Sequence, residues 1–243
     1  MSDIPVPPAP MASETSAPAT PPVATPPSPG IAGEWKPFFD QHHSLLRSIA
    51  SELQSCAESK QVVYPCKEDI FRCFALAPAK IRVVILGQDP YHNGAAMGLC
   101  FSVKGGGKLN PSLINILKEI DNPSLQAQKG DLSHWADQGC FMLNRALTVI
   151  EGRPESHLKL WNKFTESVIL YLANTYPEIV WLLMGSKAQD VTLPKNARVV
   201  MTSHPSPLGA SQSMIRGGRL VPAFRGSKAF ATVNGMLATP IKW

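Results

Sequence analysis

The sequence IRVVIL at residues 81–86 is a short apolar run that ends directly in the polar sequence GQDPYH at residues 87–92. Three further apolar runs have the same form: FML at 141–143, IVWLLM at 179–184 and ARVVM at 197–201. None alternates polar with apolar residues, which is typical of parallel strands covered by helices on both faces. All are far shorter than the roughly 18 apolar residues that cross a bilayer, so we exclude a membrane-spanning protein.

Apolar residues recur at helical intervals in the segments around these runs. The segments are residues 35–56, 112–120, 157–172 and 227–237. Asn110 and Pro111 supply an N-cap and a first-turn proline for the second segment. Because strands and helices alternate along the chain, the sequence predicts an α/β fold. Its architecture would be a three-layer α/β/α sandwich with a central four-stranded parallel sheet.

The N-terminal segment has a different composition from the rest of the chain. Residues 1–30 contain 10 of the 23 prolines and no aromatic residue, and Asp3 and Glu14 are their only charges. Such a segment buries too little apolar surface to offset its ordering entropy. We therefore expect a disordered Pro/Ala-rich tail over residues 1–33 and one folded domain over residues 34–243. The tail lacks the features of a secretory signal or a mitochondrial presequence.

Charge and cysteine content narrow the class of protein. The chain has 23 basic and 18 acidic residues, and without Asp3 and Glu14 the remainder carries a net charge of +7. This surplus fits a nucleic-acid partner, although many ordinary enzymes carry a similar positive charge.

The five cysteines form no C-x-x-C pair and lack His residues at metal-site spacing. They favour reduced, mostly buried thiols in an intracellular protein over a zinc site.

Polar residues follow each of the four apolar runs. Asp89 follows the first, Asn144 the second, Gly185 and Ser186 the third, and His204 the fourth. Ligands of open parallel sheets bind outside the carboxyl ends of the strands, so the sequence predicts an active site at that edge. Taken alone, Asp89 could cap a helix or a turn, His204 could be a structural histidine of the core, and Asn144 could hydrogen-bond the backbone at a strand end. Together they can polarise water, donate to a developing anion and bind the edge of a heterocycle.

Motifs of other enzyme classes are incomplete. The sequence GGGK at residues 105–108 is followed by Leu109, where a phosphate-binding loop needs Ser or Thr. Neither a G-x-S-x-G elbow nor a G-x-G-x-x-G turn after a strand occurs.

Five motifs together resemble those of the family 1 uracil-DNA glycosylases and occur in that family's order. They are GQDPYH at 87–92, GLCFSV at 98–103, MLN at 142–144, LLMGS at 182–186 and HPSPL at 204–208. The resemblance extends from about residue 35 to residue 243. It implies a monofunctional enzyme that hydrolyses the N-glycosidic bond of uracil flipped out of single- or double-stranded DNA. Such an enzyme initiates base-excision repair, needs no metal or other cofactor and acts as a monomer.

The resemblance implies a role for each matching residue. Asp89 would activate the attacking water, and His204 would stabilise the negative charge that develops on uracil O2. Four residues would bind uracil: the Gln88 backbone, Tyr91 against a thymine methyl, Phe101 by stacking and Asn144 by hydrogen bonds. Leu208 would fill the gap in the base stack. The remaining DNA contacts would come from His92, Pro111, Ser112, Gly185, Ser186 and Ser206.

Two other functions are compatible with part of this resemblance. A glycosylase for another base is disfavoured by Tyr91 and Asn144, and a non-catalytic DNA-binding subunit is disfavoured by Asp89 and His204. We expect the nucleus, with the mitochondrion as the alternative, and a repair or replication protein as the partner of the tail.

Residues 209–228 are about ten residues longer than the common family form, with four basic residues and no acidic one. They either pack their apolar residues on the domain or extend the wedge formed by Leu208.

Overall fold

The computed structural model describes residues 30–104, 106, 108–121 and 123–243. At its centre lies a parallel sheet with the strand order β3-β2-β5-β6. The strands are β2 (Val83–Gly87), β3 (Cys140–Asn144), β5 (Val180–Met184) and β6 (Arg198–Thr202). Each lies within two residues of a predicted apolar run. The predicted fold class, a four-stranded parallel sheet between helices, is confirmed.

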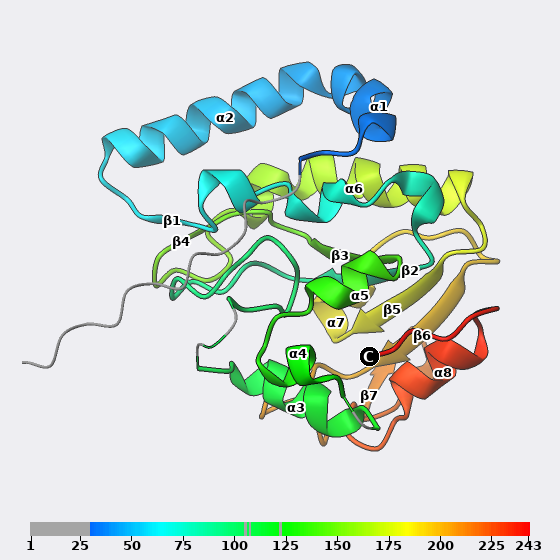
Figure 1. The fold of residues 1–243 in the computed structure, drawn as a ribbon. Coiled ribbons are helices and arrows are strands. Elements are labelled where there is room, and N and C mark those ends of the chain that lie inside the picture. The colour runs from blue at the N-terminus through cyan, green and yellow to red at the C-terminus, as the bar shows by residue number, and fades with distance from the viewer. Residues whose placement is uncertain (1–29, 105, 107, 122) are drawn as a thin grey trace, which may run out of the picture.

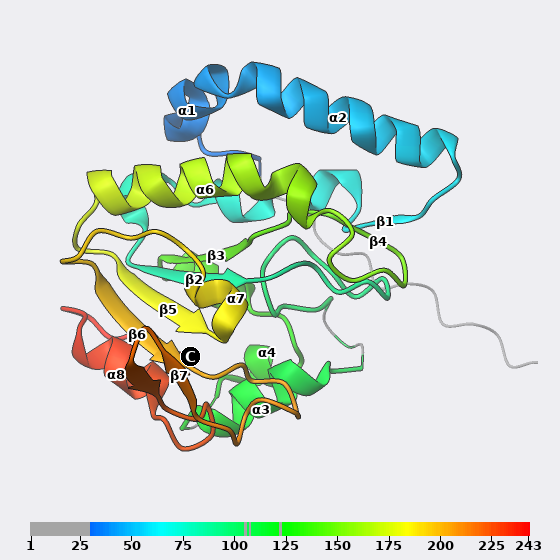
Figure 2. The ribbon, with the colours of Figure 1, turned by 180° about the vertical axis from the view of Figure 1, so that it is seen from behind.

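Helices cover both faces of this sheet (Figures 1 and 2). One side carries α1 (Lys36–Gln41), α2 (His43–Glu58) and α6 (Leu158–Thr175). The other side carries α3 (Pro111–Glu119), α4 (Leu125–Gln128), α5 (Ser133–Asp137) and α8 (Ala229–Gly235), and α7 (Ser186–Gln189) follows β5. Short 3-10 helices are η1 (Gly33–Trp35), η2 (Lys67–Asp69), η3 (Arg72–Ala75) and η4 (Pro78–Lys80).

Two small antiparallel pairs lie outside the central sheet. One joins β1 (Val63–Tyr64) to β4 (Val149–Ile150), and the other joins β7 (Met214–Arg216) to β8 (Arg219–Val221). The second pair was not predicted as strands. It arises from the long segment after Leu208.

Aromatic clusters attach the helices to the two faces of the sheet. Phe164 of α6 lies 6.0 Å from Phe74, which packs edge-on against Phe141 of β3. On the other face, Trp135 of α5 lies 5.9 Å from Phe230 of α8 between ring centroids. These side chains are buried, and each contributes roughly 2 kcal/mol through the apolar surface it removes from water.

The predicted helical segments are observed with shifted ends. Residues 35–56 form two helices, because His42 leaves the helical conformation and its Nδ1 lies 2.8 Å from the Phe38 carbonyl oxygen. Asn110 takes the N-cap position of α3 with Pro111 in the first turn, as predicted, although the Asn110 side chain makes no capping hydrogen bond. None of the helices in the described ranges is both long and apolar enough to span a bilayer.

All five cysteines are free, and four of them are buried: Cys56, Cys73, Cys100 and Cys140. Burial raises the pKa of these thiols. Cys66 is exposed. Residues 1–29, which contain most of the predicted tail, lie outside the described residues, so the predicted boundary between residues 33 and 34 stays a prediction.

Candidate active site

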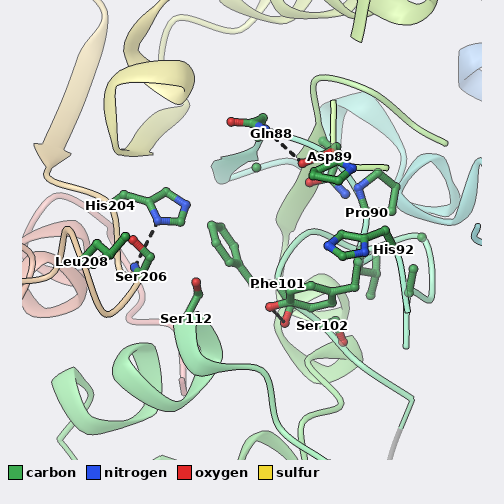
Figure 3. A pocket seen from close by; sticks show the side chains of 17 residues that line it. Gln88, Asp89, Pro90, His92, Phe101, Ser102, Ser112, His204, Ser206 and Leu208 are labelled. Carbon is green, nitrogen blue, oxygen red and sulfur yellow. Dashed lines mark hydrogen bonds between the residues drawn. The ribbon is translucent and has the colours of Figure 1, made fainter. Parts of the chain in front are cut away.

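A cavity of about 770 Å3 opens at the carboxyl ends of the parallel strands. Ten of the thirteen predicted site residues line it: Gln88, Asp89, Tyr91, His92, Phe101, Ser112, Asn144, His204, Ser206 and Leu208. In the view of Figure 3, Asp89 and His204 lie on either side of Phe101. A cavity of this volume is large enough for one nucleotide-sized ligand.

Asp89 follows β2, and both of its carboxylate oxygens accept hydrogen bonds. Oδ2 accepts from the Glu155 backbone N–H at 2.7 Å, and Oδ1 accepts from the Gln88 side-chain amide at 3.2 Å. Burial raises the pKa of Asp89, while these two donors oppose that effect. The carboxylate is thus held in place and is more basic than an ordinary aspartate, which suits a group that takes a proton from water.

Glu155 supports the Asp89 loop through its backbone and its side chain. Its φ of 64° places it in the left-handed region, which is uncommon for a residue with a side chain. This conformation directs its N–H to Asp89. Its carboxylate accepts from the Gln88 amide at 3.0 Å and lies 3.7 Å from the Lys187 ammonium.

A backbone hydrogen bond fixes the imidazole of His204 in one tautomer. The Ser206 backbone N–H donates to Nδ1 at 3.0 Å, so Nδ1 is unprotonated and the neutral ring carries its hydrogen on Nε2. Burial lowers the pKa of His204. The ring is therefore neutral at physiological pH and presents its Nε2–H as a hydrogen-bond donor. A fixed donor of this kind can stabilise a negative charge that develops on a ligand in the cavity.

Glycines make room for two of the site side chains. A Cβ on Gly87 would lie 2.1 Å from Asn144 Oδ1, so a side chain at position 87 would displace the Asn144 amide. A Cβ on Gly185 would lie 2.8 Å from the His204 Cβ, and its φ of 93° is itself unfavourable for other residues. Close packing against backbone thus fixes both Asn144 and His204.

Asn144 is 7% exposed at the end of β3. Among the described residues, its carboxamide has no hydrogen-bond partner, although it borders the cavity. A buried amide usually has a partner. Its two donors and its acceptor are thus available to a ligand in the cavity.

Phe101 and Tyr91 shape the wall of the cavity. Phe101 adopts a left-handed conformation with a φ of 62°, and the Tyr91 hydroxyl donates to its carbonyl oxygen at 3.2 Å. Backbone strain of this kind costs about 1–3 kcal/mol and is concentrated at functional sites. The Phe101 ring lies 6.3 Å from the His204 ring between centroids, so a flat ligand stacked on Phe101 would lie near His204.

A model of the uracil DNA glycosylase superfamily matches residues 74–234 of this chain. The chain is also 41% identical over 216 residues to a protein named uracil-DNA glycosylase from Psychromonas ingrahamii, over 84% of this chain and 95% of that protein. The chain belongs to the uracil DNA glycosylase superfamily.

Other members of the superfamily are similarly close. Uracil-DNA glycosylase 1 of Listeria innocua is 42% identical over 228 residues, which cover 86% of this chain and 96% of that protein. The crystal structure of mimivirus uracil-DNA glycosylase superposes with a TM-score of 0.78 at 31% identity, covering 88% of this chain and 87% of that one. A mimivirus UNG variant, solved in complex with UGI, gives a TM-score of 0.81 at 31% identity over 88% of each chain.

Three predicted site residues do not line the cavity of this superfamily member. Pro111 and Ser186 are exposed at the first turns of α3 and α7. The first turn of a helix has backbone N–H groups without partners inside the helix, and such groups can bind an anion. Gly185 is buried behind His204. The structure therefore supplies a packing role for Gly185 that the sequence did not indicate.

Sequence reasoning assigned no role to Glu155 or to Gly87. A glycine that ends an apolar run signals a close approach, so Gly87 could have been found. Glu155 carries no local signal, because its contact with Asp89 joins residues far apart in sequence. The described part of this superfamily member holds no group of three or more His, Cys, Asp or Glu side chains placed to bind a metal ion.

Proposed function

We propose that this protein is a monofunctional uracil-DNA glycosylase that initiates base-excision repair, with residues 34–243 as its catalytic domain. The observation that carries the proposal is the convergence on one cavity of Asp89, the Nε2–H of His204 and the unpartnered carboxamide of Asn144. Membership of the superfamily and its relatives named uracil-DNA glycosylase support the same reaction.

The substrate nucleotide must leave the duplex to reach this cavity, because the glycosidic bond of a stacked base is inaccessible. Extrusion costs a few kcal/mol, and stacking of uracil on Phe101 returns about 1–3 kcal/mol. Leu208, which is 85% exposed at the rim, occupies the space that the nucleotide leaves.

The bond that breaks joins C1′ of the sugar to N1 of uracil. A water oxygen bonds to C1′ while Asp89 accepts the proton of that water. The electron pair of the broken bond moves onto uracil, whose O2 then carries negative charge. The Nε2–H of His204 donates to O2 and stabilises the uracil anion, which is later protonated in solution.

Base selection rests on hydrogen-bond pattern and shape. The Asn144 amide N–H donates to uracil O4, and its carbonyl accepts from N3–H, whereas cytosine presents the opposite pattern at both positions. Tyr91 occupies the space that the methyl group of thymine would need, and the Gln88 backbone contacts the base. A mismatch of buried polar groups gives roughly 10⁴–10⁵-fold discrimination.

Phosphates on either side of the extruded nucleotide are held by a set of groups around the cavity. The first turn of α3 offers Pro111 and Ser112, the first turn of α7 offers Gly185 and Ser186, and the loop after β6 offers Ser206. His92 joins these contacts from the rim. Free N–H groups at helix starts favour anions.

The deciding experiment measures release of free uracil from single- and double-stranded oligonucleotides that contain one deoxyuridine. We expect release from both, and no release of cytosine or thymine from matched oligonucleotides. Strand cleavage should appear only after alkali, because a monofunctional glycosylase leaves an intact abasic site. DNA binding without uracil release would instead identify a non-catalytic subunit.

Asn144→Asp should gain cytosine release and Tyr91→Ala should gain thymine release. If neither variant releases its new base, base selection depends on other groups.

We also propose a monomer, which light scattering would test, and a repair or replication protein as the partner of the N-terminal segment. The nuclear location stays a prediction, with the mitochondrion as its alternative. The relatives from Psychromonas ingrahamii and Listeria innocua are bacterial, and bacteria have no nucleus, so these relatives give no support to the nuclear location. Microscopy of the full chain fused to a fluorophore would distinguish these locations.

A further inference from the structure

The most exposed large apolar side chains of the described residues lie in one short stretch of chain. Leu208 is 85% exposed, Ile215 78% and Leu220 73%, whereas no other exposed large apolar side chain in this set exceeds 47%. Single exposed apolar residues are ordinary on protein surfaces, but several that occur together mark a binding surface.

Ile215 and Leu220 form a cross-strand pair on the β7–β8 hairpin. Gly217 and Gly218 make its two-residue turn with φ values of 53° and 75°, as a type I′ turn requires. Ile215 lies directly opposite Leu220 in the register, so the two side chains share one face of the hairpin. That face is turned to solvent. On the other face Val221 is buried.

The hairpin is attached to the loop that carries His204 and Leu208. The Ser203 N–H donates to Pro222 O at 2.9 Å, and the Arg225 N–H donates to Ala210 O at 2.7 Å. Both legs of the hairpin therefore begin at the rim of the cavity. Ile215 and Leu220 are exposed and do not pack on the domain. For these two residues, the first alternative for residues 209–228, packing on the domain, is therefore wrong.

Basic residues adjoin the apolar pair along both strands, because Arg216 follows Ile215 and Arg219 precedes Leu220, with the arginines on the other face of the hairpin. Residues 209–228 contain four basic residues and no acidic one. Arg216 is paired with Asp190 at 3.1 Å, but Arg219 is exposed and has no ion pair within the described ranges. The two arginines lie opposite one another on the hairpin, and Asp190 is paired with only one of them, so a second anion beside Arg219 would relieve the remaining repulsion.

We infer that the β7–β8 hairpin is a second DNA-contacting element, which places Ile215 and Leu220 in the groove beside the extruded nucleotide and Arg219 on a flanking phosphate. The inference rests on the proposed function. Proteins that open a groove combine apolar side chains inserted at base steps with arginines on the backbone. A partner protein or a second copy of the chain is disfavoured by the uncompensated positive charge and by attachment to the Leu208 loop.

The test compares two hairpin variants and two control variants with the wild type on duplex and single-stranded DNA containing deoxyuridine. The double variant Ile215→Ser, Leu220→Ser removes the apolar pair, and Arg219→Gln removes the free charge. Leu170→Ser on α6 is the matched control for an exposed apolar residue, and Lys195→Gln before β6 is the control for an exposed cation. Thermal unfolding verifies that every variant is folded.

The double variant should bind duplex DNA about tenfold more weakly, because it loses apolar contact area, with an unchanged salt slope. Arg219→Gln should reduce the slope of log Kd against log salt by about 0.9, as expected for one lost phosphate contact. Excision from short single strands should stay within twofold of wild type for both. The controls should resemble the wild type in every assay.

Three results would overturn the inference. The first is wild-type duplex affinity and salt slope in both hairpin variants, and the second is equal losses on single strands and duplex. The third is a concentration-dependent dimer that the double variant abolishes, since the hairpin would then bind a second copy. Absence of uracil release by the wild-type protein would instead refute the proposed function and leave the duplex-binding comparison readable.

Discussion

The cavity and the β7–β8 hairpin are built in opposite ways. In the cavity, glycines that admit no side chain confine His204 and Asn144, and the Ser206 backbone N–H also holds the His204 imidazole. On the hairpin, Ile215 and Leu220 extend into solvent from strands of three residues each. Chemistry needs groups placed within fractions of an ångström, whereas a surface that meets DNA can become ordered on binding. The contrast predicts that cavity variants change rate and hairpin variants change affinity.

The largest effect is expected for Asp89→Asn, which removes the group that takes the proton of water. The single-turnover rate of uracil release should fall by about 10²–10⁴-fold, with duplex affinity within a few fold of wild type. Because burial raises the pKa of Asp89, the rate of the wild-type enzyme should decline toward acid at a pH above the ordinary aspartate value of about 3.9.

The same pKa shift fixes the sign of the stability change. A folded-state pKa above the unfolded value means that folding favours the protonated carboxyl, so ionisation at neutral pH destabilises the fold. Asp89→Asn should therefore unfold at a slightly higher temperature than wild type at pH 7, and at the same temperature under acid conditions. A rate near wild type would remove Asp89 from the mechanism.

A smaller loss of rate is expected for Gly185→Ala, whose Cβ would lie 2.8 Å from the His204 Cβ. A displacement of His204 by a fraction of an ångström to 1 Å should lower the rate by about 10²-fold. Gly152→Ala is the matched control, because Gly152 also has a positive φ but has open space around its Cβ position. Gly152→Ala should lose about 1–2 kcal/mol of stability, and Gly185→Ala should lose more because its Cβ also meets His204. Only Gly185→Ala should lose rate.

Substitutions at Glu155 should separate its backbone from its side chain. Glu155→Val disfavours the left-handed conformation, so the N–H should leave Asp89, and the rate should fall by about tenfold. Loss of that donor raises the pKa of Asp89, which moves the acid limb of the pH–rate profile to higher pH.

Glu155→Gly preserves the conformation and the N–H but removes the nearby negative charge. The acid limb should therefore move to lower pH, with a rate close to wild type. Shifts in the same direction for the two variants would contradict this division of roles.

The smallest effect concerns stability. Replacement of residues 212–221 by a short Gly-Ser bridge should lower the unfolding temperature by no more than about 6 °C, since the hairpin buries Val221 as its single fully covered side chain and such a side chain contributes about 1.5 kcal/mol. A large loss of stability would show that the hairpin supports the fold, and the contrast between the two regions would fail.

The four apolar runs predicted the sheet because a strand buried on both faces requires an uninterrupted apolar sequence. IRVVIL became β2, and the stripe that includes Trp161 and Phe164 became the buried side of α6. The break at His42 was not predictable, because the apolar spacing of residues 35–56 continues across it. The β7–β8 hairpin was also missed, because its strands are three residues long and only half covered.

Within the site, sequence reasoning brought together ten residues that line one cavity, because strand ends of a parallel sheet meet at one edge. It could not anticipate the support given by Glu155 to Asp89 or by Ser206 to His204. These contacts depend on backbone conformation, and neither a left-handed glutamate nor a backbone N–H aimed at an imidazole has a sequence signature.

The order of the strands also has a consequence for synthesis. Val83 of β2 pairs with Cys140 on one side and with Val180 on the other, so both of its partners follow it along the chain. Such non-local pairing gives a high contact order and slow folding. At a ribosomal rate of roughly 5–20 residues per second, β2 must wait about 5–20 seconds for the roughly 100 residues that complete its pairing. During that interval its apolar edges depend on chaperones or on the preceding part of the chain for cover.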